Sequence, residues 1–443
     1  MPPTPRALRR ALLTIIVLAL WGLITHGTFA GSGDEPHYLA VAHSIAFDSD
    51  FDLSNNYGDA EPLIAGGLLK PEAHVRPGVG GVMRPVHDVG LPMLFAPYVG
   101  FAVPLTNYLA RAIPPNVMQR ARLNPGLLYR HLLSLAMITL TAILAGLMFD
   151  SLIAIGAPAA FAFATVLIVT LSPPLLIFSI LFFTELLSAL LGFAVFRSIV
   201  IASTTGARAW AIVGLATGTL FLVHARNIGF VLPLTAIALM QLRSPSRRAE
   251  AGAFTIGLAI AIGVRTWINY HFWGTLVQGP HARFEMPGFD AIASAMGMRI
   301  TALLVDQEFG LFTYAPIYLL AIGGVFAFAR EKPQVTLAAA AVCVSYVGLI
   351  ACPITNVHGW MGGWNPAARF LTPLTPIFAL FVYAGLRASP RLLAVPIVSL
   401  QILISAYAWQ HPKMLWNDGD GVAAFCETTA ARVCAWLPSF PGP

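Results

Sequence analysis

A short acidic sequence, GDEPHYL, follows the first apolar segment of the chain at residues 33–39. Its two adjacent carboxylates, Asp34 and Glu35, stand where the chain leaves an apolar environment. Ionisable groups are costly at such a place and are often functional. A carboxylate there can act as a general base, because it reaches a hydroxyl group at a membrane surface. The alternative is structural, with Asp34 as the N-cap of a helix that has Pro36 in its first turn and His37 near its third position.

Arginine side chains supply the cations that a phosphate group would need. The guanidinium fork matches phosphate oxygens better than an ammonium group does. The candidates are Arg84 ahead of His87 and Asp88, Arg226 in HARNIGF, and Arg369 in NPAARFL. The alternative for each is a lone arginine that extends its charge to the membrane interface.

The histidines and the remaining acids form no recognised metal motif. The sequence has no HxxxH or HExxH pair, and the alternating aspartates of residues 48–56 lack the glycine and distal glutamate of a calcium loop. We therefore interpret three of these residues as contacts to an acceptor substrate or within their loop, namely His37, His87 and Asp88. No Gly-rich phosphate loop or nucleophile elbow occurs either. The sequence also shows no nucleotide-binding domain, so a lipid-linked substrate is more consistent with it than a nucleotide-linked one.

These residues lie between segments that are typical of a membrane protein. Hydrophobic residues make up 57% of the 443 residues and charged residues only 10%, with a mean hydropathy of +0.74. Soluble domains carry about a quarter charged residues, so an ordinary globular protein is excluded. The net charge of +6 is spread over the ends of apolar segments. That distribution follows the positive-inside rule and gives no basic and aromatic stripe for nucleic acid.

About eleven membrane-crossing helices are predicted from apolar segments near the length of a bilayer. They cover residues 11–29, 131–149, 157–173, 185–201, 209–223, 228–242, 251–268, 310–329, 334–351, 373–387 and 392–408. Segment 90–107 is also apolar, but three prolines interrupt it, and we predict that it does not cross. This topology keeps the N-terminus and the arginine-rich turn at residues 243–248 in the cytoplasm.

The predicted fold is therefore an all-α polytopic protein of a bacterial inner membrane. Its transmembrane module covers residues 1–408, with a long first external loop at about 30–130 that carries short amphipathic helices. A short external tail, residues 409–443, contains Cys426 and Cys434, whose pairing the sequence leaves open. The first segment imitates a signal peptide, with residues 28–30 similar to a cleavage site, but we expect an uncleaved first span.

The arrangement resembles the GT-C superfamily of membrane glycosyltransferases, which includes the protein O-mannosyltransferases and the aminoarabinose transferases of lipid A. In that superfamily one span leads to an acidic motif that opens a long external loop, and Asp34-Glu35 matches that motif in position and type. The resemblance extends over most of residues 8–390. Its further motifs are HDVGLPMLFAPY at 87–98, SPPLLIFSILFFTELL at 172–187, QEFGLFTYAPIYLLA at 307–321 and GGWNPAARFLTPLTP at 362–376.

The resemblance implies an inverting hexosyl- or pentosyltransferase with its active site on the periplasmic face. A polyprenyl-phosphate-linked sugar would be the donor, and a lipid, glycan or protein would be the acceptor. Asp34 would be the general base beside Glu35, while Glu185 matches a second acidic position that could hold the acceptor or a divalent cation. Family members commonly have aspartate there, so the glutamate leaves the metal ligands unknown, and no other cofactor is implied. The donor phosphate would be bound by Arg84, Arg226 and Arg369.

A secondary transporter or a flippase, for a lipid-linked or small polar substrate, is the alternative from another class. Transporters usually show paired repeats and broken helices near the bilayer midplane. The sequence has interrupted segments at 90–107 and 172–184, but no matching halves.

Overall fold

The computed structural model is all-α apart from two short ribbons of two strands each. It describes residues 3–26, 33–57, 70–71, 74–202, 204–276, 288–353, 360–428 and 434–440, and 18 α-helices occur within these ranges. The cleavage-like residues 28–30 lie outside the described residues.

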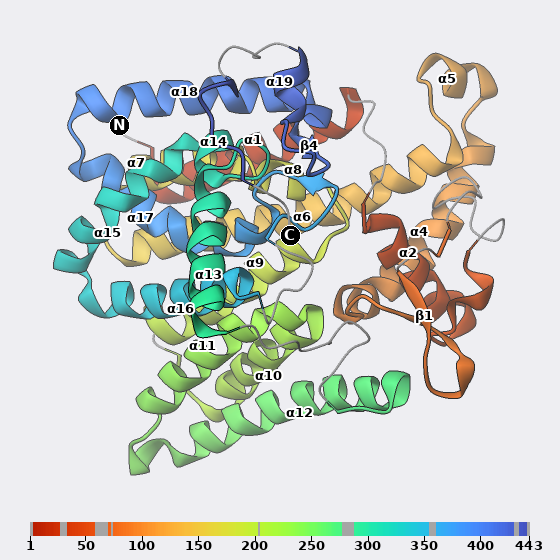
Figure 1. Ribbon diagram of the computed structural model, residues 1–443, viewed down its shortest axis with the longest axis horizontal. Helices are drawn as coiled ribbons and strands as arrows, with labels where there is room; N and C mark the ends of the chain where they lie inside the picture. The colour runs from red at the N-terminus through yellow and green to blue at the C-terminus, as the bar shows by residue number, and fades with distance from the viewer. Residues whose placement is uncertain are drawn as a thin grey trace.

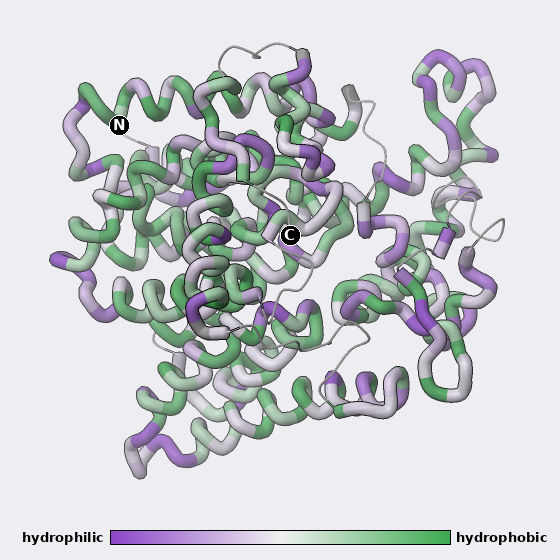
Figure 2. Tube along the Cα trace, viewed as in Figure 1, coloured by the Kyte–Doolittle hydropathy of each residue, from purple (hydrophilic) through white to green (hydrophobic). Residues whose placement is uncertain are grey.

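Eight helices of the described chain are long and apolar enough to cross a membrane. They are α1 (Pro5–His26), α4 (Gly90–Ala112), α6 (Pro125–Ala154), α9 (Thr184–Phe196) with its π-helical continuation (Arg197–Ile201), α12 (Arg248–Trp273), α16 (Pro333–Ala351), α17 (Thr375–Ala388) with the preceding 3-10 turn (Arg369–Leu374), and α18 (Arg391–Gln410). Three shorter apolar helices are α7 (Ala159–Thr170), α10 (Ala207–Val223) and α11 (Ile228–Gln241). Figure 2 shows the long helices as mostly hydrophobic, with hydrophilic residues at their connecting turns. This is the pattern of a multi-pass membrane protein.

Ten of the eleven predicted segments coincide with seven of the long helices and the three shorter ones. The eleventh, 310–329, is divided into α14 (Leu311–Tyr314), a 3-10 turn (Pro316–Tyr318) and α15 (Leu319–Glu331). The break falls at Pro316, which lacks the N–H that would continue the helix from α14. Hydropathy alone did not reveal this division.

Segment 90–107 is not interrupted, contrary to the prediction from its prolines. It forms the single helix α4, with Pro97 and Pro104 inside it. Pro92 lies in the first turn, where its missing N–H has no helical partner to lose. The other two prolines share one exposed face with the large apolar side chains of Leu94, Phe101 and Tyr108. An apolar stripe of this kind is suited to contact with lipid.

Helices α1 and α6 are antiparallel neighbours. Near the beginning of α1, Arg9 forms an ion pair with Asp150 in the last turns of α6, with 3.0 Å between Nε and Oδ1. Near the end of α1, the ring of Trp21 lies 6.3 Å from that of His131 in the first turns of α6. The chain therefore leaves α1 and enters α6 at the same end of the bundle.

The segment between α1 and α6 carries several short elements beside the long helix α4. It contains α2 (Glu35–His43), β1 (Val75–Pro77), β2 (Met83–Pro85), α4 and α5 (Pro115–Arg120). Figure 1 shows α2, α4, α5 and β1 gathered on the right, beside the bundle of long helices. Short helices in the first polar segment were predicted, whereas the hairpin of β1 and β2 was not.

The C-terminal segment is bound to the body of the protein. Strand β4 (Trp416–Asn417) pairs with β3 (Asn365–Pro366), and Glu308 accepts hydrogen bonds from the backbone N–H groups of Gly419 and Gly421 at 3.0 and 2.8 Å. Cys426 in α19 (Ala424–Thr428) forms a disulfide with Cys434, which answers the question that the sequence left open. The described part of the tail is thus bound to the rest of the fold.

The remaining α-helices of the described chain are α8 (Leu175–Phe178) and α13 (Phe289–Val305).

Glycines allow the closest helix contacts in the bundle. Gly324 of α15 faces Gly385 of α17, and a Cβ atom on Gly324 would collide with the carbonyl oxygen of Phe381. A Cβ atom on Gly385 would collide with the carbonyl oxygen of Leu320 in the same way. Backbone is in contact with backbone here, so no flexible side chain can move aside. Small residues allow close helix packing of this kind in membrane bundles.

Replacing Gly324 by alanine is therefore expected to destabilise the protein by about 1–3 kcal/mol, since α15 and α17 must separate. The control is Gly323→Ala on the same helix, where nothing lies within 4 Å of an added Cβ atom. That variant should be neutral or more stable by up to about 1 kcal/mol. Thermal unfolding of the purified variants in detergent gives both values, and equal unfolding temperatures would contradict this account of the α15–α17 contact.

Candidate functional site

Asp34 stands at the N-cap position of α2, but its carboxylate makes no capping hydrogen bond. Only its backbone carbonyl takes part in the helix start, accepting from the N–H groups of His37 and Tyr38 at 3.1 Å each. The carboxylate instead faces Arg369, whose NH2 group lies 2.6 Å from Oδ2. The capping alternative is therefore wrong for the side chain, which is directed into the protein.

Glu185 is fully buried in the first turn of α9 and accepts from two arginines. Its Oε1 atom lies 2.7 Å from Nε of Arg369 and 2.5 Å from NH2 of Arg226. Asp34, Glu185, Arg226 and Arg369 thus form one connected network of ion pairs, called the four-residue network below. Its members come from four separate parts of the sequence, and the charges sum to zero.

The two arginines of the network are held by aromatic rings as well as by carboxylates. Arg226 lies in a 3-10 turn between α10 and α11, with its guanidinium carbon 4.6 Å from the ring centre of Phe370. Arg369 follows Ala368, which has a left-handed backbone with φ of 55°. Its guanidinium carbon lies 5.0 Å from the ring centre of Phe183. Stacking of this kind fixes the plane of a guanidinium group.

Asp34 is ionised in this surrounding. Burial alone would raise the pKa of its carboxyl group, but the charge of Arg369, followed by that of His87, holds the pKa well below its usual range. Burial and the neighbouring imidazoles of His74 and His87 lower the pKa of His37 to about 3, so that His37 is neutral. The pKa of His224 also lies well below its usual range, because of burial and then the charge of Arg226.

Glu35 faces away from the four-residue network although it follows Asp34 directly. Its carboxylate lies 2.5 Å from NH1 of Arg130 at the start of α6, and it accepts from the backbone N–H of Phe182 at 2.7 Å. Only 2% of its side chain is exposed. Consecutive residues of a helix do not share a face, which separates the two acids. The structure therefore does not bring Glu35 together with Asp34.

Asp88 lies beside the turn that carries Arg226. It accepts from the backbone N–H of Ala225 at 2.6 Å and forms an ion pair with Arg265 of α12. His224 lies 3.5 Å from the same carboxylate. Asp88 therefore helps to hold Arg226 toward Glu185. Arg265 was missed in the sequence, although an arginine inside an apolar helix is a recognised functional signal.

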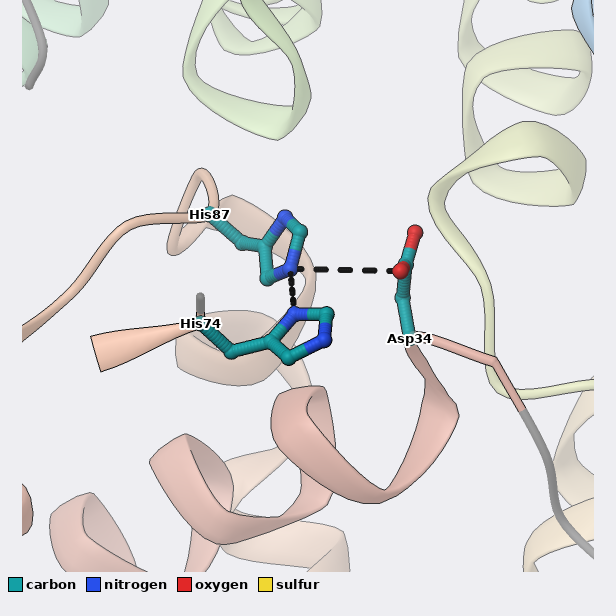
Figure 3. A group of neighbouring side chains, drawn as sticks. All are labelled: Asp34, His74 and His87. Atoms are coloured by element: carbon teal, nitrogen blue, oxygen red, sulfur yellow. Dashed lines mark hydrogen bonds and ion pairs between the residues drawn. The ribbon is translucent and has the colours of Figure 1, made fainter. Parts of the chain in front are cut away.

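His87 lies next to Asp34 together with a histidine that the sequence reasoning missed. The Nε2 atom of His87 is 3.9 Å from Oδ1 of Asp34 and 2.6 Å from Nδ1 of His74 (Figure 3). The ring of His37 stacks on that of His74 at 3.5 Å and its Nδ1 atom lies 2.9 Å from the hydroxyl of Tyr57. The signal for His74 was the pattern VRPGVGGVMRP, whose central glycines predict a hairpin.

Arg84 is not part of the four-residue network. It lies in β2, with its guanidinium carbon 5.0 Å from the ring centre of Phe272 at the end of α12. No contact in the described part of the chain joins it to Asp34 or Glu185. Of the three predicted phosphate ligands, the structure brings Arg226 and Arg369 together and leaves Arg84 apart.

Comparison of the chain with protein-family models, curated proteins and solved structures finds no match. The resemblance to the GT-C superfamily therefore stays a prediction from the motifs.

The ion pair of Glu35 and Arg130 is expected to stabilise the fold. Glu35→Gln keeps a hydrogen-bond acceptor for Phe182 but leaves Arg130 without its charged partner, so we expect a loss of about 1–3 kcal/mol. Glu331→Gln is the matched control, since Glu331 pairs with Arg387 at 3.1 Å while 52% of its side chain is exposed. That variant should cost less than about 1 kcal/mol. Thermal unfolding measures both, and a smaller loss for Glu35→Gln than for the control would contradict the assignment.

Proposed function

We propose that this protein is a membrane glycosyltransferase that moves a sugar from a polyprenyl-phosphate donor to an acceptor hydroxyl at the external face of the inner membrane. The observation that carries the proposal is the four-residue network, in which the buried Arg369, the half-buried Arg226 and two carboxylates meet at one place. The guanidinium groups suit the donor phosphate, and a carboxylate suits the acceptor hydroxyl. The motifs that resemble the GT-C superfamily supply the reaction class.

The reaction needs the acceptor oxygen, the anomeric carbon of the sugar and the phosphate oxygen of the donor in line. The acceptor oxygen attacks the anomeric carbon of the donor sugar and gives its proton to Asp34. The bond from that carbon to the phosphate oxygen breaks on the opposite side, so the configuration inverts. Arg226 and Arg369 stabilise the negative charge that grows on the departing polyprenyl phosphate.

The pair of Asp34 and Arg369 suggests how the base is activated. A carboxylate whose pKa is held well below its usual range is a poor proton acceptor. When the donor phosphate binds Arg369, the guanidinium shares its charge with the phosphate oxygens, and the pKa of Asp34 rises toward its ordinary value. Donor binding thereby prepares the base for the acceptor.

An apolar groove offers a place for the lipid part of the donor. It has a volume of about 610 Å³ and is lined by residues of α1, α7, α8 and α18, among them Ala19, Phe163, Leu167, Leu176, Ile402 and Trp409. Helix α8 connects the groove to the site, because the ring of Phe178 lies 5.7 Å from that of Phe183, on which Arg369 stacks. A polyprenyl chain in the groove would thus have its phosphate near the arginines.

The contacts between helix ends support a topology in which α4 does not cross. Glu35 follows α1 and touches Arg130 at the start of α6, so both lie on one side of the membrane. Within the described residues, α4 is the only helix between them that is long enough to cross. A single crossing would separate the two residues by about 30 Å. With α4 at the surface, the predicted eleven spans place the four-residue network outside and the turn at residues 243–248 inside.

The disulfide of the tail supports the same orientation. Trp416 of β4 lies 6.5 Å from Phe183 between ring centres, so the tail and the site are on one face. The bond between Cys426 and Cys434 suits an oxidising compartment such as the periplasm.

The transporter alternative is less well supported by this geometry. Alternating access requires a substrate site near the middle of the bilayer. Asp34, Glu185, Arg226 and Arg369 instead lie at helix beginnings or in a turn between two helices. In the eleven-span topology these helix ends all lie toward the same face, away from the midplane.

Asp34→Asn tests the mechanism, because the amide keeps the shape of the side chain and cannot accept the proton. We expect transfer from a polyprenyl-phosphate sugar to fall by about 10²–10⁴-fold, with donor binding retained. Thermal unfolding should show a loss of about 1–3 kcal/mol at most, because Arg369 loses the charge of Asp34 but keeps Glu185. Asp290→Asn, on exposed α13, is the control and should transfer normally. The measurement is sugar transfer by purified protein in nanodiscs. Unchanged turnover in Asp34→Asn would overturn the role of Asp34 as base.

Single cysteines test the topology in a background with Cys343→Ala and Cys352→Ala. In spheroplasts, an impermeant thiol reagent should label Gln119→Cys in α5 and should label Ser246→Cys only after lysis, because α5 lies outside and residues 243–248 lie inside. Both positions are exposed. Labelling of Gln119→Cys only after lysis would show that α4 crosses and would contradict the proposed topology.

A further inference from the structure

Asp34, His74 and His87 converge on one point beside the four-residue network. One nitrogen or oxygen of each lies within 4.8 Å of the others. Figure 3 shows the two imidazole rings side by side, with the Asp34 carboxylate facing the Nε2 atom of His87. Its other oxygen, Oδ2, is the one that pairs with Arg369. Oδ1 is therefore directed toward the histidines.

The hairpin of β1 and β2 fixes the two histidines relative to each other. Val75 pairs with Pro85, and the backbone N–H of Val86 donates to the carbonyl of His74 at 3.0 Å. The chain reverses at Gly80 and Gly81, both with positive φ, which brings the ends of the hairpin together. The histidine positions are thus set by local backbone structure rather than by a substrate.

Two imidazoles and one carboxylate are a ligand set that binds divalent transition metals. Zinc takes histidine nitrogens at 2.0–2.1 Å, which in a tetrahedron places two of them about 3.3 Å apart. The nitrogens of His74 and His87 are now 2.6 Å apart, and Oδ1 of Asp34 is 3.9 Å from His87. The first distance is about 0.7 Å shorter and the second about 0.6 Å longer than that spacing.

We propose that Asp34, His74 and His87 bind one divalent transition-metal ion, with zinc as the best-matched ion. Three protein ligands leave the fourth tetrahedral position open, as in catalytic rather than structural zinc sites. The binding of the ion rests on these three side chains alone. Its role rests on the proposed function: the open position takes the acceptor hydroxyl and lowers its pKa next to Asp34.

The charges of the site accommodate such an ion. The two carboxylates and two arginines of the four-residue network sum to zero, and the histidine ligands are neutral when they bind metal. The donor phosphate adds a negative charge, which becomes larger as the phosphate departs. A divalent ion bound through Oδ1 of Asp34 offsets that charge, and Oδ2 becomes free for the proton when Arg369 turns to the phosphate.

The test is the zinc content of the purified full-length protein after equilibration with micromolar Zn²⁺ and removal of the excess, measured by elemental mass spectrometry. We expect about one zinc ion per chain. His74→Gln and His87→Gln should each lose it. His271→Gln is the control, since this exposed histidine lies at the end of α12 beside Trp267 and should keep the zinc. Size-exclusion profiles and thermal unfolding establish that each variant is folded.

Equal zinc content in the unaltered protein and in both folded variants, or no zinc in any of them, would overturn the site. Visible absorption of Co²⁺ bound in place of zinc gives a second readout, and loss of a tetrahedral spectrum in both variants would support it. Transfer that survives complete removal of the metal would overturn the catalytic role. These metal measurements need no transfer assay, so absence of transfer by the unaltered protein would count against the proposed function alone.

Discussion

The contact of Arg369 with both Glu185 and Asp34 is the interaction on which the remainder of the site depends. Moving a charge from water into a protein interior costs several kcal/mol, so a buried carboxylate persists only with a cation beside it. Glu185 is fully buried and has two such partners. Arg369 also reaches a residue 335 positions earlier in the chain. The beginnings of α2, α9 and the turn before α17 must therefore meet at one place.

That requirement explains why the short elements surround the site. Each member of the four-residue network comes from a helix start or a turn, where backbone groups lack helical partners and side chains can approach one another. The turn carrying Arg226 is held by Asp88, and the loop before Arg369 is held by the β3–β4 pair. The C-terminal tail is necessary for the second of these contacts. The polar C-terminal tail thus has a structural role, because it holds the loop that precedes Arg369.

Much of the four-residue network could be predicted from the sequence, because charged residues are rare in the chain. Asp34, Glu185, Arg226 and Arg369 stand out at the ends of apolar segments, and an even number of crossings places them on one face. Proximity along the chain, however, is a poor guide to which side chains meet in the fold. Glu35 adjoins Asp34, yet the helical rotation between consecutive residues turns it toward Arg130. His74 was missed because its approach to His87 depends on a hairpin, and hydropathy carries no signal for that pairing.

The neutrality of the four-residue network limits how the proposed anionic donor would enter. A phosphate that binds both arginines competes with Glu185 and Asp34 for the same N–H donors. Arg369 holds Asp34 through NH2 and Glu185 through Nε, so it can release the more exposed partner and keep the buried one. Asp34 retains 18% exposure of its side chain, whereas Glu185 has none. The less costly exchange therefore frees Asp34, the residue to which the proposed mechanism assigns the proton.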